Sequence, residues 1–221
     1  MATYDLEEQE KLAELKTWWQ QYGNRVTSIA VALALGVAAW QGWQWWQHQQ
    51  SAKASAIYSG LQEAAGKNDA KRVKELAGEL IEKYSGTSYA GMGALIAARV
   101  QVDQGDFKNA RVQLAWAADH SDDTGLRALA RLRLATVLLD EKAYDEALKQ
   151  LAAEPPVPFA ARYADVRGDI YVAQGKSAEA AKSYDDALAK IDASAKNEEV
   201  SRHQAYREIV QTKRDALGIA Q

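Results

Sequence analysis

The residues that could carry out acid–base or metal chemistry are few in this sequence and lie far apart. Its histidines are His48, His120 and His203, and it contains no cysteine. Zinc and similar ions need several His, Cys or carboxylate ligands at short, regular spacing, and no such spacing occurs here. Lone histidines on helices are most often structural or solvent-facing, so we expect no metal site and no cofactor.

One segment, Gly86-Thr87-Ser88-Tyr89-Ala90-Gly91, comes close to the glycine-x-serine-x-glycine turn that exposes a nucleophilic serine in hydrolases. However, the second glycine comes one residue too late, and no strand precedes the segment. It is better interpreted as a helix boundary, where Thr87 or Ser88 caps the helix that follows. The sequence also has no phosphate-binding glycine loop and no dinucleotide fingerprint. We therefore predict a protein that is not an enzyme.

A long uncharged segment near the N-terminus indicates where the protein resides. No charged residue occurs between Arg25 and Lys53, and residues 26–46 read VTSIAVALALGVAAWQGWQWW. As a helix this segment rises about 31 Å, enough to cross a hydrocarbon core of about 30 Å. Aromatic residues typical of membrane interfaces flank it on both sides: Trp18, Trp19 and Tyr22 before it, and Trp40, Trp43, Trp45 and Trp46 at its end. We predict one transmembrane helix at residues 26–46, with membrane lipid around it.

Two other interpretations of this segment are a cleaved signal peptide and a buried core helix. Signal peptides begin with a short basic region, whereas acidic residues outnumber basic ones in residues 1–25. The small-residue motif Ala52-Lys53-Ala54 also lies well beyond the apolar run. The flanking aromatic residues argue against a core helix, because indole rings favour the depth of the lipid headgroups. An uncleaved anchor is therefore the preferred interpretation.

The distribution of basic residues predicts the orientation of the anchor. Lys11, Lys16 and Arg25 precede the span, whereas only Lys53 occurs among the twenty residues that follow it. Because basic flanks stay in the cytoplasm, residues 1–25 should be cytoplasmic and residues 47–221 should form a periplasmic domain of a bacterial inner-membrane protein. After residue 25 the chain holds 24 basic and 25 acidic residues, a balance that argues against nucleic acid as a partner.

One helix-turn-helix phrase recurs in the exported part, at residues 104–110 (QGDFKNA), 141–147 (EKAYDEA) and 174–180 (QGKSAEA). The closing alanines are 37 and then 33 residues apart, close to the tetratricopeptide period of 34. Close packing of each hairpin requires small residues on both helices, and these are Ala98 with Ala110, Ala135 with Ala147, and Gly168 with Ala180. We predict an all-α protein with a single N-terminal transmembrane helix followed by a tetratricopeptide-like repeat array; the alternative is a helical bundle with coincidental alanines.

The match to the repeat is uneven along the array. Residues 51–84 form a helical pair without a good match to the repeat. In the middle repeat, Pro155 and Pro156 should end the second helix early, because proline cannot continue a helix.

Repeat geometry also predicts a partner-binding surface. In tetratricopeptide arrays the first helix of each pair lines the concave face, and the ligand-facing positions here are Met92, Leu95, Arg99, Leu129, Leu132, Thr136, Arg162, Asp165 and Asp169. This mixture of apolar and oppositely charged groups suits a polypeptide partner. Alternatively, Leu129 and Leu132 pack between repeats, because stacked repeats must bury apolar surface against each other.

The order of features along the whole chain resembles a known family, the YfgM-type ancillary subunits of the bacterial SecYEG translocon. The most specific segments are LKTWWQQYGN at residues 15–24, GWQWW at residues 42–46 and ADVRGD at residues 164–169. The resemblance implies an inner-membrane protein that binds exported polypeptides at the translocon, works beside a PpiD-like membrane chaperone and links clients to periplasmic chaperones. The alternative is a membrane-tethered scaffold for another cell-envelope assembly.

Overall fold

The computed structural model describes residues 2–195 and 200–218, and within them it contains helices and turns but no strand. The helices are α1 (Ala2–Gly66), α2 (Ala70–Lys83), α3 (Ser88–Asp103), α4 (Phe107–His120), α5 (Thr124–Asp140), α6 (Tyr144–Gln150), α7 (Val157–Ala173), α8 (Ser177–Ala195) and α9 (Val200–Asp215). The predicted all-α class is thus confirmed. The chain divides into two compact units, Met1–Gln50 and Ser51–Gln221, whereas the predicted boundaries at residues 25 and 46 stay predictions.

The first unit is the N-terminal part of α1. Its apolar side chains are exposed throughout residues 26–46, and Leu33 and Leu35 are each 66% exposed. The few hydroxyl groups in this part find partners within the helix: Thr27 donates to the carbonyl of Gly23 at 2.7 Å, and Ser28 donates to that of Asn24 at 2.8 Å. A helix that is apolar on all sides and satisfies its own polar groups is suited to lipid rather than to water.

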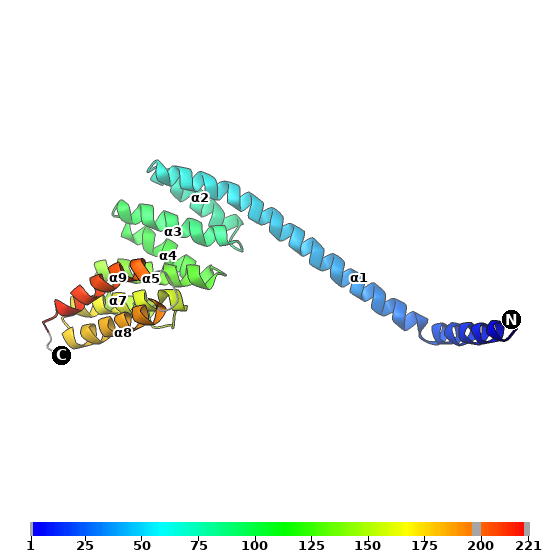
Figure 1. Ribbon diagram of the computed structural model, residues 1–221. Coiled ribbons are helices and arrows are strands. Elements are labelled where there is room, and N and C mark those ends of the chain that lie inside the picture. The colour runs from blue at the N-terminus through cyan, green and yellow to red at the C-terminus, as the bar shows by residue number, and fades with distance from the viewer. Residues whose placement is uncertain (1, 196–199, 219–221) are drawn as a thin grey trace. The chain divides into compact units, whose positions relative to one another are not determined.

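The second unit is a series of antiparallel helical hairpins, in which each helix packs against the next (Figure 1). Three groups of buried apolar side chains hold it together. One joins the end of α1 to α2 and α3, a larger one extends from α3 to α7, and the third joins α7, α8 and α9. Trp116 of α4 packs against both the first and the second group. Helix α7 supplies side chains to both the second and the third group, so each group shares a helix with the next, as expected for stacked repeats.

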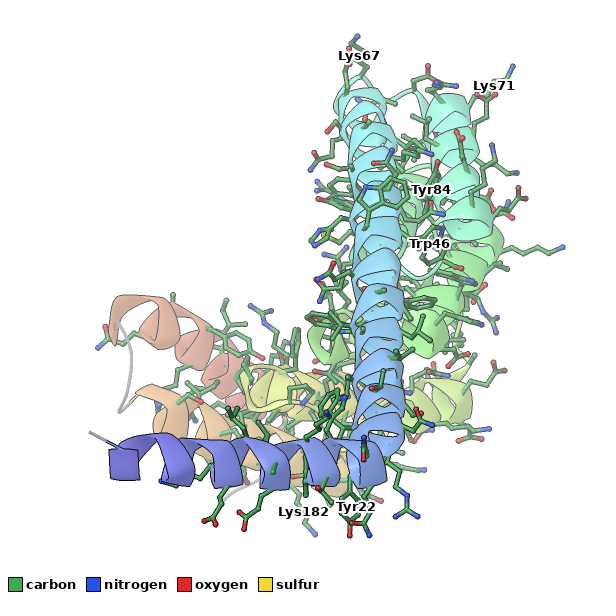
Figure 2. All side chains as sticks on the ribbon, turned by 90° about the vertical axis from the view of Figure 1, so that its right-hand side faces the viewer. Tyr22, Trp46, Lys67, Lys71, Tyr84 and Lys182 are labelled. Atoms are coloured by element: carbon green, nitrogen blue, oxygen red, sulfur yellow. The ribbon has the colours of Figure 1, made fainter. Side chains whose placement is uncertain are left out.

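Four hairpin turns share one backbone geometry. The turn residues Asn68, Gly105, Lys142 and Gly175 all have positive φ, between 56° and 77°. In each turn the next residue donates its backbone N–H to a carbonyl five residues earlier, at 2.8–2.9 Å, which satisfies a carbonyl at the end of the helix. The turn at Asn68 joins α1 to α2, and Figure 2 shows Lys67 and Lys71 pointing outward from it. The helical pair of residues 51–84 therefore uses the same turn as the recognised repeats.

The proline-rich loop shortens one hairpin. Helix α6 has 7 residues, compared with 14 in α4. Pro156 caps the N-terminus of α7, and Pro158 occupies its first turn, a position where a missing backbone N–H costs nothing.

Candidate functional site

The small residues of the predicted hairpin contacts are all buried: Ala98, Ala110, Ala135, Ala147, Gly168 and Ala180. Gly168 makes a closer approach than the sequence indicates. A Cβ atom built on it would lie 2.3 Å from Cε1 of Tyr184, so the tyrosine ring of α8 lies directly against the backbone of α7. Gly93 is a second such position, since a Cβ there would lie 2.7 Å from Cδ1 of Leu80.

The structure separates the residues of the predicted concave surface into three groups. Leu95, Leu129 and Leu132 belong to the large apolar core or pack against it, which is the alternative role considered for the last two. Met92 is half-buried, whereas Arg99, Thr136 and Arg162 are exposed. The remaining two, Asp165 and Asp169, contact the C-terminal helix.

Arg99 and Thr136 come together at a small cleft between α3 and α5. The cleft has a volume of about 210 Å³ and an apolar floor formed by Ala98, Val102, Leu114 and Val137. Charged residues surround it, with Arg99 and Asp103 on α3 and Arg133 and Asp140 on α5. An apolar floor with charges of both signs at its edge can hold an apolar side chain of a polypeptide while its backbone and polar groups meet the edge.

The other two predicted residues, Asp165 and Asp169, lie under α9. Nζ of Lys213 donates to Asp165 at 2.9 Å and to Asp169 at 2.8 Å. The hydroxyl of Tyr206 donates to Asp165 at 3.0 Å, and that of Tyr184 donates to Asp169 at 2.8 Å. We call these five residues the C-terminal polar cluster. Both carboxylates therefore already have internal partners, and a binding partner would have to compete with Lys213 for them.

The three proton donors of the C-terminal polar cluster hold their protons more tightly than usual. Burial raises the pKa of Tyr184, and its hydrogen bond to Asp169 raises it further. Burial also raises the pKa of Tyr206, and the negative charge of Asp165 adds to this effect. Burial by itself lowers the pKa of Lys213, but the hydrogen bonds and charges of Asp169 and Asp165 outweigh it, so the pKa lies above its usual value.

The predicted interface residues of the first unit are exposed. The exposed fractions of Trp18, Trp19, Tyr22, Trp40, Trp43, Trp45 and Trp46 lie between 38% and 69%. Some of the rings contact each other, with centroids 5.9 Å apart for Trp18 and Tyr22 and 5.4 Å apart for Trp43 and Trp46. Within the described part of the chain, one helix is long and apolar enough to cross a membrane, judged by length and composition, and it contains this segment.

The residues considered for catalysis have structural partners or lie apart. The His120 ring stacks on the Trp116 ring with centroids 5.2 Å apart, and Nδ1 of His120 lies 3.0 Å from the backbone carbonyl oxygen of Trp116. Thr87 is the N-cap residue of α3, but its hydroxyl donates to the carbonyl of Tyr84 and not to the helix. Across residues 2–195 and 200–218, no group of three His, Asp or Glu side chains is placed to hold a metal ion.

Sequence reasoning missed Tyr206 and Lys213 as partners of the predicted surface. They are seven residues apart on α9 and therefore share one helix face. That spacing was visible in the sequence, but nothing local indicates which carboxylates they meet, because the contacts join residues more than 40 positions apart.

The repeat architecture agrees with the comparison to known families. Residues 16–219 match the family described as tetratricopeptide repeat-like domain. Among curated proteins, the ancillary SecYEG translocon subunit of Neisseria gonorrhoeae is 30% identical over 96% of this chain and 98% of the relative. The protein of the same name from Haemophilus influenzae is 34% identical over 83% of this chain and 90% of the relative. That from Escherichia coli is 28% identical over 76% of this chain and 81% of the relative. The resemblance seen in the sequence is confirmed: the chain belongs to the family of ancillary SecYEG translocon subunits, which carry a tetratricopeptide repeat-like domain.

Proposed function

We propose that this chain is a non-enzymatic accessory subunit of the SecYEG translocon, anchored in the bacterial inner membrane by one span. The observation that carries the proposal is that similarity to ancillary translocon subunits extends over the anchor as well as the repeats, up to 98% of a relative's length. The exposed apolar helix and the stacked hairpins supply the two parts that such a role needs: a membrane tether and a surface for polypeptides.

In the proposed arrangement the N-terminus is cytoplasmic and the repeat domain is periplasmic. The basic residues before the span support this orientation, because they favour the cytoplasmic side. There the domain meets exported polypeptides, a PpiD-like membrane chaperone and soluble periplasmic chaperones, as the family resemblance implies. A tether raises the local concentration of partners at the membrane, so modest affinities suffice for each contact.

The cleft between α3 and α5 is the part of the predicted concave surface best suited to a polypeptide. Arg99 and Thr136 are exposed beside its apolar floor. By contrast, Asp165 and Asp169 are bound by Lys213. We therefore propose the cleft between α3 and α5, rather than the carboxylates held by α9, as the first contact with clients.

Site-specific photo-crosslinking in cells tests this function. A photoreactive residue replaces Thr136 at the cleft or, as the control, Lys182, an exposed residue on α8 (Figure 2). We expect exported polypeptides to crosslink at Thr136 and not at Lys182, and translocon subunits to co-purify with the full-length protein in mild detergent. If translocon subunits are absent and components of another envelope assembly co-purify instead, the membrane-tethered scaffold replaces this function.

A further inference from the structure

A second cavity opens where helix α6 ends early. Because α5 and α6 run antiparallel, an α6 of only 7 residues does not reach the first turns of α5. The loop that follows α6 borders an open cavity of about 450 Å³ there, which is lined by α5, by Tyr163 of α7 and by the loop residues 153–156. The three-proline loop therefore shapes a site that a full-length repeat helix would fill.

Two arginines face this cavity, which we call the arginine cavity. Arg127 and Arg131 are four residues apart, so they lie on the same face of α5, and both side chains are half-buried. Arg127 donates one N–H to the carbonyl of Ser121 at 3.2 Å. Within the described residues, neither guanidinium forms an ion pair with a carboxylate. Each guanidinium carries five N–H donors, so donors remain for a ligand.

The walls of the arginine cavity are fixed and partly apolar. Tyr163 of α7 is 2% exposed, and its hydroxyl donates to the carbonyl of Ala128 on α5 at 2.9 Å, which holds the two helices together beside the cavity. Pro155 and Pro156 also line the cavity. Glu154 also lines the cavity, so two positive charges and one negative charge face a ligand.

These features select the chemistry of the ligand. Arginine binds planar carboxylates through pairs of parallel N–H donors. The balance of one positive charge matches the single negative charge of a carboxylate, whereas a phosphate dianion carries one negative charge more than this balance. The proline rings suit the aliphatic part of a peptide. We propose that the arginine cavity binds one carboxylate of a polypeptide, either a C-terminal carboxylate or an Asp or Glu side chain; this inference rests on the proposed polypeptide-binding function.

Three fluorescein-labelled peptides of one alanine- and leucine-containing sequence test the proposal by fluorescence anisotropy with the full-length protein in detergent. One peptide has a free C-terminal carboxylate, one has a C-terminal amide and an internal glutamate, and one has a C-terminal amide and no acid. We expect one of the two carboxylate peptides to bind about tenfold more tightly than the neutral peptide, the size expected for charge-assisted hydrogen bonds. The tighter of the two identifies the source of the carboxylate.

Variants connect this preference to the cavity. The double variant Arg127→Gln and Arg131→Gln should bind all three peptides equally. The matched control, Lys108→Gln with Lys182→Gln, removes the same charge from two exposed residues outside the cavity and should keep the preference. If the unmodified protein binds the three peptides equally, the proposal is overturned, and this result does not depend on whether the variants fold. Displacement of the peptide by inorganic phosphate but not by acetate also overturns it. Neither result affects the translocon co-purification, so the two proposals fail separately.

Discussion

At the scale of single residues, Gly168 has the closest neighbour of any glycine in the repeat domain, and that neighbour is an aromatic ring. The sequence pairs Gly168 with Ala180, and both are buried, but the ring of Tyr184 lies nearest to the glycine. Tyr184 is 2% exposed, and its hydroxyl is held by Asp169. The ring is thus fixed at both ends, because its backbone belongs to α8 and its hydroxyl is bound to α7.

The first prediction concerns the change Gly168→Ala. Its new Cβ would lie within 2.3 Å of a ring that cannot retreat, so we expect the free energy of unfolding to fall by about 1 to 3 kcal/mol. Gly78 provides the control, since it lies within α2 and no atom approaches its Cβ position within 4 Å. Gly78→Ala should raise stability by about 0.5 to 1 kcal/mol, because alanine favours helices. Chemical denaturation followed by ellipticity at 222 nm measures both, and equal stability of the two variants would contradict the packing.

The second prediction concerns the C-terminal polar cluster at alkaline pH. Tyr184, Tyr206 and Lys213 have raised pKa values in the folded protein, so they bind protons more tightly than in the unfolded chain. The resulting stabilisation is complete below about pH 10, where the unfolded groups are protonated, and is lost as the pH rises through the folded-state pKa values. We therefore expect the melting temperature to fall as the pH rises above about 10.

The variant Lys213→Met tests the origin of that loss. It leaves Asp165 and Asp169 without their cation, so we expect a loss of about 1 to 3 kcal/mol at pH 8 and a smaller further loss on going to pH 11. Lys182→Met, at an exposed position, should behave like the unmodified protein. An unchanged alkaline slope in Lys213→Met would show that Lys213 does not contribute to it.

At the scale of elements, the hairpin turns determine how the helices follow one another. Gly105 and Gly175 adopt the left-handed conformation at low cost, whereas Lys142 adopts it with φ of 61° despite its side chain. The third prediction is that Lys142→Gly stabilises the domain by about 0.5 to 1 kcal/mol and that Gly105→Ala destabilises it by about 1 to 2 kcal/mol. Lys176→Gly, one residue beyond the equivalent turn position, should give no gain. Thermal melting of the three variants compares these signs directly.

Much of this arrangement could be predicted from the sequence, because turn and packing signals are local. The phrases at residues 104–110, 141–147 and 174–180 mark three of the four turns, and their alanines lie in the core. The remaining turn, at Asn68, lies within the helical pair predicted at residues 51–84, but it was not recognised as a repeat turn because no phrase closed by alanine follows it. The hydrogen bonds from Lys213 of α9 to Asp165 and Asp169 could not be predicted, because a contact between residues far apart in the chain produces no repeating pattern in the sequence. The arginine cavity was missed because it depends on the path of the loop after α6.

At the scale of the whole molecule, the two units divide the work of the proposed function. Residues 26–46 expose apolar side chains that only lipid or another apolar helix can cover. The repeat domain, by contrast, buries its apolar side chains in three successive groups and presents clefts edged with charge. The core of the repeat domain does not include residues 26–46, so the domain needs the anchor only for its location. The side of the membrane on which the domain lies then decides which partners it meets.

The fourth prediction tests that side directly. The chain has no cysteine, so single cysteines at Thr3 and at Asp122 can be labelled selectively. Asp122 is exposed, whereas its neighbour Ser121 is 6% exposed and unsuitable for labelling. An impermeant thiol reagent added to intact spheroplasts should label Asp122→Cys and not Thr3→Cys, because basic residues before the span favour a cytoplasmic N-terminus. Both variants should react after lysis, which controls for accessibility. Labelling of Thr3→Cys alone in intact spheroplasts would reverse the orientation and remove the repeat domain from the compartment where exported clients emerge.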